Sequence, residues 1–370
     1  MTPEKNSPIR VCFLSLKAYP IFNSSVNAVF GGAEVDLYLL ATEIAKDDGF
    51  QASFVVGDYG QENIETRENV TIIKSLDVNK NLFLCSPRIW KALKKANADI
   101  YMQEACSLST VLFAFFCKCK NKKFVYRTAS TRECDGTYAR QHYFRGKAVN
   151  WAFSNSDKLI TQNEDDLAIL KKITGLSSTV IGNAARLSEL TQKNRNTILW
   201  VGRSAPVKRP DLFLELARQV PDEHFTMICP RASGDNNYEK LVAEANGIGN
   251  LDFVTSVPFH KIDNYFQRAG IFVNTSDSEG FPNTFVQACK SATPILSLNV
   301  NPDKFLDSNK CGVCANGNWE KFANSLKSLL DEKVMEELGG NGRKYAEQKH
   351  NIKKIIQYYK DIFTELMRQA

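Results

Sequence analysis

Several familiar signatures are missing from this chain of 370 residues. Its longest apolar run, near residues 108–117, is too short to cross a bilayer. No GxGxxG motif occurs, which argues against the nicotinamide-binding fingerprint. A single CxxC, from Cys311 to Cys314, has neither a second CxxC nor a nearby histidine pair, so a zinc site is not expected. The sequence therefore does not favour a membrane-spanning protein, a nicotinamide enzyme or a zinc protein.

The charge of the chain is mildly positive, with a formal net charge of +6. The excess is spread along the sequence without a basic motif interleaved with aromatic residues, so nucleic acid is not an expected partner. A helix predicted over residues 86–97 carries four cations on its outer face, which suits either solvent or anionic lipid. They are Arg88, Lys91, Lys94 and Lys95. No basic-then-apolar signal opens the chain, so we expect a cytoplasmic location, with peripheral contact at the inner membrane face left open.

Strand and helix patterns alternate along both halves of the chain. The first series of expected strands covers 9–16, 51–57, 70–73, 99–103, 122–128, 158–161 and 178–183, and the second covers 197–202, 224–229, 250–254, 271–274 and 293–298. Such alternation predicts an α/β protein with two doubly wound, Rossmann-like domains. The polar residues 184–196 are interpreted as a linker, which gives domains at 1–185 and 190–350. A last helix with one apolar stripe, within 351–370, is expected to lie back across the first domain.

The stretch 276–290 reads as a strand end, a short loop and a helix. The first N–H groups of a helix attract anions, and Gly280 lets a ligand approach the backbone closely. The Glu279 carboxylate can accept hydrogen bonds from hydroxyls, and Gln287 offers both a donor and an acceptor. These features suit a sugar nucleotide. The alternative is an ordinary loop whose glutamate is merely solvated.

A second loop, residues 202–209, carries two cations between a strand and a helix. Arg203 offers a planar fork for phosphate oxygens, and Lys208 offers a point charge. Two cations in one loop match a diphosphate, although a basic turn in solvent remains the alternative. Because both loops follow strands of the same domain, we expect them to converge on one ligand.

The first domain offers weaker candidates. Gly31 and Gly32 open a helix after the first strand, where they permit either close approach by a phosphate or sugar or tight helix packing. Arg127 near the carboxyl end of the strand at 122–128, and Arg132, Glu133 and Asp135 after it, are candidates for a ligand cleft. An ion pair within the loop is the alternative.

These motifs together resemble those of the retaining glycosyltransferases of family 4, also called group 1. The matching segments are GGAE, SDKLITQNEDDLAILKK, VIGN, WVGRSAPVKRPDLFLELA, SDSEGFPNTFVQA followed by ATPIL, and the final helix. The resemblance implies the GT-B architecture, in which two Rossmann-like domains face each other across a cleft and a C-terminal helix crosses back to the N-terminal domain.

The resemblance also implies roles for individual residues. Arg203 and Lys208 would neutralise the departing diphosphate, and Glu279 would hold hydroxyls of the donor sugar. The implied donor-binding residues are Gly202, Pro230, Ser256, Val257, Gly280, Phe281, Pro282, Asn283, Thr284 and Gln287. Gly31, Gly32, Arg127, Arg132 and Asp135 are the implied acceptor or cleft residues. No cofactor and no metal are expected, because Arg203 and Lys208 would supply the positive charge.

Two positions depart from the family pattern. Gln287 stands where the family's E-x7-E motif has its second glutamate, and Ala129 and Ser130 stand where many members carry a histidine. The implied function is transfer of a sugar, with retention of configuration, from a nucleotide-diphosphate sugar to a glycan or glycolipid hydroxyl, in surface polysaccharide or lipopolysaccharide assembly. The alternatives are a nucleotide-sugar epimerase of GT-B fold and a non-catalytic nucleotide-sugar-binding protein.

Overall fold

The computed structural model describes residues 7–26, 28–77, 82–141, 143–191 and 195–369. The chain forms two compact units: an N-terminal unit that runs to Ala184 and includes the last helix from Ile352, and a C-terminal unit from Ala185 to Asn351. Residues 185–191, predicted as linker, lie within the C-terminal unit instead. Ala185 is buried there, and its N–H donates to the carbonyl of His350 at 2.8 Å.

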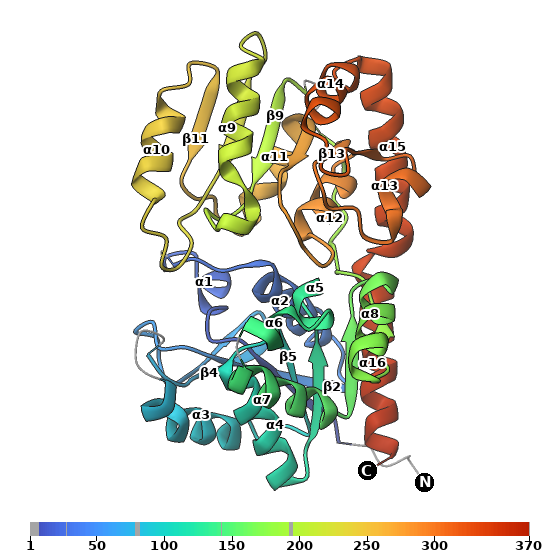
Figure 1. Cartoon of the computed structure of the whole chain (residues 1–370). Helices are drawn as coiled ribbons and strands as arrows, with labels where there is room; N and C mark the ends of the chain where they lie inside the picture. The colour runs from blue at the N-terminus through green and yellow to red at the C-terminus, as the bar shows by residue number, and fades with distance from the viewer. Residues whose placement is uncertain (1–6, 27, 78–81, 142, 192–194, 370) are drawn as a thin grey trace. The chain divides into compact units, whose positions relative to one another are not determined.

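The N-terminal unit is built on an eight-stranded sheet in the order β3-β4-β2-β1-β5-β6-β7-β8 (Figure 1). Its strands are β1 (Ile9–Leu14), β2 (Phe50–Val56), β3 (Ile64–Arg67), β4 (Val70–Lys74), β5 (Ile100–Glu104), β6 (Lys123–Arg127), β7 (Lys158–Thr161) and β8 (Thr179–Val180). Every pairing is parallel except that of β3 with β4. The predicted strands are present, and β3 is an additional one.

Helices of the N-terminal unit follow the strands in sequence. They are α1 (Tyr19–Phe22), α2 (Gly32–Ile44), α3 (Leu82–Ala96), α4 (Leu108–Lys120), α5 (Thr131–Cys134), α6 (Thr137–Gln141), α7 (Tyr143–Ser154), α8 (Glu164–Thr174) and α16 (Ile352–Arg368). The helix predicted over 86–97 thus begins earlier, at Leu82. The last helix, α16, packs its apolar stripe on α2 and β1, and Lys360 pairs with Asp47 at 2.5 Å. Its predicted return to the N-terminal domain is confirmed.

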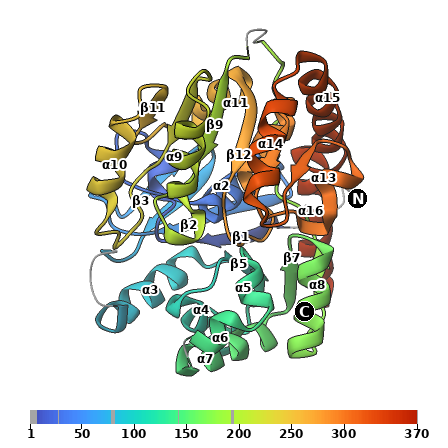
Figure 2. The ribbon, with the colours of Figure 1, turned by 45° about the horizontal axis from the view of Figure 1, so that its top comes forward.

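The C-terminal unit contains a parallel sheet of six strands in the order β11-β10-β9-β12-β13-β14 (Figure 2). The strands are β9 (Thr197–Val201), β10 (Phe225–Ile228), β11 (Leu251–Val254), β12 (Ala269–Asn274), β13 (Ile295–Ser297) and β14 (Gly312–Cys314). The helices are α9 (Pro210–Gln219), α10 (Tyr238–Asn246), α11 (Ile262–Arg268), α12 (Asn283–Lys290), α13 (Phe305–Ser308), α14 (Trp319–Leu329) and α15 (Glu332–Lys349), with 3₁₀ turns η1 (Pro206–Lys208), η2 (Phe259–Lys261) and η3 (Pro302–Lys304).

Apolar cores on both faces of this second sheet explain its strand sequences. One core joins Trp200 and Phe225 to α9 and α14, and the other joins Phe272 to α11, α12 and α13. All six residues of β12 are therefore buried, which is why this strand is a continuous apolar run rather than an alternating one. The polar side chain of β12 is that of Asn274, at the carboxyl end of the strand. The expected doubly wound α/β class is confirmed in both units.

Candidate active site

The strand order of the C-terminal unit reverses between β9 and β12. From β9 the chain moves outward to β10 and β11, and then returns to place β12 on the other side of β9. In open α/β sheets, ligands bind beyond the carboxyl ends of the strands at such a switch point. The loop with Arg203 and Lys208 follows β9, and the loop with Glu279 follows β12. Both predicted loops therefore start at the switch point.

Hydrogen bonds hold these two loops together. The indole N–H of Trp200 donates to the Thr275 hydroxyl at 2.9 Å, and this hydroxyl is shared between the carbonyls of Lys208 and Arg209, each at 2.8 Å. The N–H of Asp277 donates to the carbonyl of Val207 at 2.9 Å. The backbone that carries Lys208 is thus fixed against the end of β12.

Lys208 and Glu279 form an ion pair across the two loops. The other carboxylate oxygen of Glu279 accepts hydrogen bonds from Asn274 Nδ2 at 3.0 Å and from Ser276 Oγ at 2.7 Å. The Lys208 side chain is 25% exposed and that of Glu279 is 13% exposed, so solvent still reaches the pair. Asn274 and Ser276 were not assigned a role from the sequence, although Ser276 begins the recognised stretch.

The pKa of Glu279 reports the balance of forces at this pair. Burial alone would raise the pKa of the carboxyl, but attraction to the Lys208 ammonium and the hydrogen bonds from Lys208, Ser276 and Asn274 outweigh it. The pKa therefore lies below its usual value, and the carboxylate is charged at neutral pH. A charged carboxylate is the form that accepts hydrogen bonds from hydroxyls.

Helix α12 begins beside this pair, with Pro282 at its N-cap. The first N–H groups of the helix carry partial positive charge. The Phe281 side chain faces the other way, into an aromatic cluster where its ring lies 5.0 Å from Phe305 and 5.1 Å from His350. The side chain of Phe281 is therefore part of the core, so the implied donor-site role could come only from its backbone.

The other predicted donor residues lie along the same edge of the sheet. Gly202 follows β9, and a Cβ there would come within 2.9 Å of the Trp200 ring, which explains the glycine. Pro230 follows β10, and its carbonyl accepts from the N–H of Ser204 at 3.1 Å. Ser256 and Val257 follow β11; Ser256 is exposed, whereas Val257 packs against the core.

Three predicted residues, one on the loop after β9 and two on α12, keep side-chain groups available. Arg203 is exposed and, within the described ranges, forms no ion pair. Thr284 and Gln287 are half-buried on α12, and neither side chain makes a hydrogen bond to the residues that the structure covers. The edge thus combines one exposed guanidinium, one paired ammonium, a helix N-terminus and neutral polar groups.

Arg127 requires a correction, because it does not line a cleft. Its side chain is 1% exposed, and its guanidinium donates to Glu104 at 2.6 Å, Asp36 at 3.2 Å and Asn183 at 2.6 Å. Burial, against the attraction of Arg127, raises the pKa of Glu104. Arg127 is thus paired with buried carboxylates within the N-terminal unit, so the residue is structural. The alternative interpretation of Arg127 as an ion-pair residue is closer to the structure, although its partners lie outside the loop.

Gly31 and Gly32 start α2, and a neighbouring glutamate occupies this helix end. The Gly31 N–H donates to Glu34 Oε2 at 2.7 Å, and the Ser15 hydroxyl donates to Glu34 Oε1 at 3.0 Å. This is a capping arrangement, in which the glutamate at the third helical position reaches back to the cap residue. Glu34, three residues after Gly31, is the feature of the sequence from which this capping arrangement could have been predicted.

Helix α5, which follows β6, carries a carboxyl with a raised pKa. Burial raises the pKa of Glu133 to about 7, although the Tyr126 hydroxyl donates to it at 2.6 Å. Its neighbours are engaged locally: Arg132 donates to Gln141 at 2.5 Å, and Asp135 accepts from the N–H of Thr137 at 2.7 Å. Their acceptor-side roles stay predictions.

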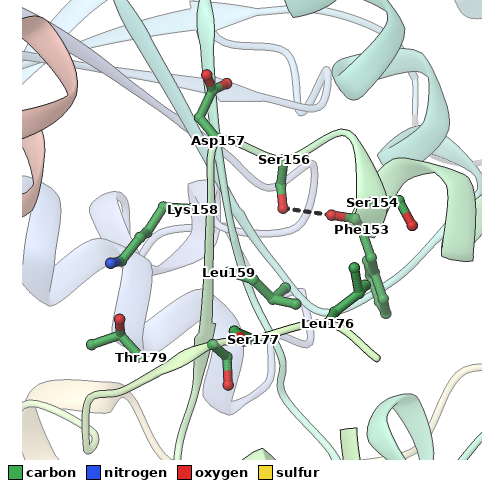
Figure 3. Close-up of a pocket in the computed structure, with 10 residues that line it drawn as sticks. Phe153, Ser154, Ser156, Asp157, Lys158, Leu159, Leu176, Ser177 and Thr179 are labelled. Atoms are coloured by element: carbon green, nitrogen blue, oxygen red, sulfur yellow. Dashed lines mark hydrogen bonds between the residues drawn. The ribbon is translucent and has the colours of Figure 1, made fainter. Parts of the chain in front are cut away.

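A hollow of about 210 Å³ lies elsewhere in the N-terminal unit, at the start of β7 (Figure 3). Serines line much of it, but the Ser156 hydroxyl is bonded to the carbonyl of Phe153 at 2.7 Å. In Figure 3 the Lys158 ammonium and the Ser156 hydroxyl point in different directions. Its polar groups do not converge, and β7 starts there, so this hollow is not at the carboxyl edge.

Two absences concern only the part of the chain that the structure describes. None of its helices is both long and apolar enough to cross a membrane. No group of three or more His, Cys, Asp or Glu side chains there could hold a metal ion. The expectation that no metal is required stays a prediction.

Comparison with known proteins gives a family match for the C-terminal unit. Residues 183–348 match the family model described as glycosyl transferases group 1. An uncharacterized glycosyltransferase of Haemophilus influenzae is 23% identical over 223 residues, which cover 57% of this chain and 62% of that protein. The UDP-Gal:alpha-D-GlcNAc-diphosphoundecaprenol alpha-1,3-galactosyltransferase of Escherichia coli is 24% identical over 238 residues, which cover 58% of this chain and 59% of that protein. The chain thus spans about three fifths of the length of these two relatives.

Solved structures extend the likeness to the whole chain. The sucrose-phosphate synthase of Thermosynechococcus elongatus superposes with a TM-score of 0.79 over 97% of this chain and 99% of that one. The identity between them is 16%, so this likeness concerns the fold. The architecture expected as GT-B is confirmed.

Proposed function

We propose that this chain, whose C-terminal unit belongs to the glycosyl transferases of group 1, is a retaining enzyme of family 4 that uses a nucleotide-diphosphate sugar. It would transfer the sugar to a hydroxyl of a glycan or glycolipid. The observation that carries the proposal is the Lys208–Glu279 pair at the switch point of the sheet, beside Arg203 and the start of α12. A cationic group for the diphosphate and a carboxylate for sugar hydroxyls lie side by side there.

Donor binding would rearrange this pair. The diphosphate would attract the Lys208 ammonium and the Arg203 guanidinium, with the first N–H groups of α12 as further donors. Glu279 would then accept hydrogen bonds from hydroxyls of the sugar, still held by Asn274 and Ser276. Lys208 would thus exchange a carboxylate for a phosphate without leaving its place.

The chemical step would use the same charges. The bond between the anomeric carbon and the diphosphate oxygen breaks, and the acceptor oxygen forms a bond on the same face of the sugar. The acceptor proton passes to the departing phosphate, so atoms and charge balance. Arg203 and Lys208 would stabilise the negative charge that develops on the leaving group. A preorganised cation of this kind lowers the barrier without needing to move.

The donor and acceptor are proposed from the relatives. The name of the Escherichia coli relative gives a UDP sugar and a diphosphoundecaprenol-linked acceptor, which supports UDP as the donor nucleotide and a lipid-linked acceptor in surface polysaccharide or lipopolysaccharide assembly. Gln287 would contact the ribose as a neutral group. With a lipid-linked acceptor, we would expect the enzyme to act in the cytoplasm with peripheral contact at the inner membrane face.

The first experiment is calorimetric titration of the full chain with UDP, GDP and ADP, repeated for Arg203→Ala/Lys208→Ala. Binding of one nucleotide, lost in the double variant, supports the site and identifies the base. Absence of binding to all three would refute the proposed donor site.

Product analysis then separates two further readings. Sugar transfer to an added acceptor supports the transferase, whereas conversion of the nucleotide sugar without an acceptor would indicate an epimerase. Nucleotide binding without turnover would indicate a non-catalytic nucleotide-sugar-binding protein. Of the two alternatives, Gln287 favours this one over the epimerase, because it replaces a glutamate of the family's motif.

A further inference from the structure

Two adjacent helices of the N-terminal unit contain no acidic residue. Helix α3 has 15 residues and α4 has 13, and neither sequence includes Asp or Glu. The helices lie side by side on the sheet (Figures 1 and 2). The Trp90 ring of α3 lies 4.9 Å from Phe116 and 6.1 Å from Phe115 of α4.

Helix α3 directs its cations outward. Ile89, Ala92 and Leu93 are buried against the sheet, which fixes the opposite face toward solvent. That outer face carries Arg88, Lys91, Lys94 and Lys95, all exposed. The spacing of Arg88, Lys91 and Lys95 places them in one row along the helix.

Helix α4 also carries exposed cations. Lys118 and Lys120 are exposed at its end, and Phe115 is 50% exposed beside Trp90. Lys118 donates to the neutral Asn155 at 2.7 Å, so its charge is not compensated by that contact. At two other helices the cations are compensated: Lys46, just after α2, pairs with Glu43, and Arg343 pairs with Glu347 on α15.

We propose that this basic face docks on the surface of an anionic bilayer. The face is defined as Arg88, Lys91, Lys94, Lys95, Lys118 and Lys120, with Phe115 among them. The cations are spread over the outer sides of two helices rather than converging on a point, which suits a charged surface and not a single phosphate. An exposed ring among cations is the pattern by which protein surfaces enter the headgroup region.

The inference rests on the proposed function in one respect: an enzyme whose acceptor is linked to a lipid must reach the membrane surface. The physical argument stands apart from catalysis. Each cation near an anionic membrane strengthens binding about fivefold, and this attraction weakens as salt shortens the screening length. Six such cations with one apolar ring would give measurable but reversible binding, without any spanning helix.

Vesicle co-sedimentation of the full chain tests the proposal. Phosphatidylcholine vesicles are compared with vesicles that also contain phosphatidylglycerol, at low and high salt. The test variant is Lys94→Glu/Lys95→Glu, in the last turn of α3. The matched control is Lys171→Glu/Lys172→Glu, an exposed lysine pair in the last turn of α8 with the same change of charge.

We expect the wild type and the α8 variant to bind the anionic vesicles alike, and the α3 variant to bind at least about tenfold more weakly. Phe115→Ser should weaken binding while leaving its salt dependence unchanged. Equal weakening by the α8 pair, equal binding to neutral vesicles, or no binding by the wild type would each overturn the proposal.

Nucleotide titration of the same variants separates the two proposals. The α3 variant should bind the nucleotide like the wild type, because Lys94 and Lys95 lie in the other unit from the donor site. Retained nucleotide binding without vesicle binding would refute only the docking face. Vesicle binding without nucleotide binding would refute only the proposed function.

Discussion

Replacement of Lys208 by methionine removes an ammonium from a carboxylate that is only 13% exposed. Glu279 would keep its hydrogen bonds from Asn274 and Ser276 but lose its counter-charge. We expect the free energy of unfolding of the C-terminal unit to fall by about 2 kcal/mol at pH 7, since a partly buried charge is left unpaired. We also expect kcat to fall by about two to three orders of magnitude, as when one preorganised stabilising group is removed from an active site.

A second substitution separates these two effects. In Lys208→Met/Glu279→Gln the uncompensated charge is gone, so most of the lost stability should return, whereas activity should not. Urea unfolding gives the stability of the wild type, both single variants and the double variant, and the coupling between the two sites follows from that cycle. A stabilising pair without a catalytic role would restore both properties together.

The pH dependence gives an independent check. The folded pKa of Glu279 lies below its unfolded value, so the pair contributes stability above the unfolded pKa and loses it as pH falls through the folded pKa. The stability difference between the wild type and Lys208→Met should therefore be largest near neutrality and shrink in acid. A difference that is constant across this range, or a variant with nearly wild-type turnover, would refute the reasoning.

Four further predictions concern single features. Asn274→Ala removes a donor to Glu279 and should lower kcat about tenfold with little change in nucleotide affinity, measured by steady-state kinetics and calorimetry; an unchanged kcat would remove its positioning role. Arg127→Met leaves buried carboxylates unpaired and should cost about 3 to 5 kcal/mol in urea unfolding of the N-terminal unit, whereas an exposed cleft residue would cost little. Burial raises the pKa of Glu133 to about 7, so stability should decline by about 3 kcal/mol between the unfolded pKa and pH 8, and Glu133→Gln should abolish that part of the decline in pH-dependent denaturation. Sugar transfer should survive EDTA, because Arg203 and Lys208 are proposed to carry the charge; loss of activity that Mg²⁺ restores would contradict this.

The fold was predictable wherever burial leaves a mark on the sequence. Strand β12 is buried on both faces and appears as the uninterrupted run from Ala269 to Val273. Strand β3 was missed because its residues are alternately exposed and partly exposed, with no apolar run to mark it. The turn between β3 and β4 contains Glu68 and Asn69, both with positive φ. Positive φ is not expected of a glutamate, so the sequence did not indicate this hairpin turn.

The candidate site was predictable in parts. The two loops are contiguous motifs, so their residues could be named before their contacts were known. The pairing of Lys208 with Glu279 joins residues 71 positions apart, and it depends on β9 and β12 being neighbours in the sheet. The role of Asn274 was missed for a different reason. It ends a buried strand, and only the structure shows that its amide turns back to Glu279.

Arg127 and Lys208 show why charge alone does not identify a site. Both cations follow or end a parallel strand, and both pair with a glutamate. Arg127 is 1% exposed and its partners come from three segments of the same unit, so a ligand could reach it only by breaking a buried network. Lys208 is 25% exposed and has one carboxylate partner, so a phosphate can reach its ammonium without breaking a buried network. The difference lies in exposure and in the number of partners, which depend on residues distant in sequence. A cation at the end of a strand is therefore only a candidate ligand-binding residue when the sequence alone is known. It becomes part of a candidate site when the structure shows that its ion pair is partly exposed and lies at the switch point of the sheet.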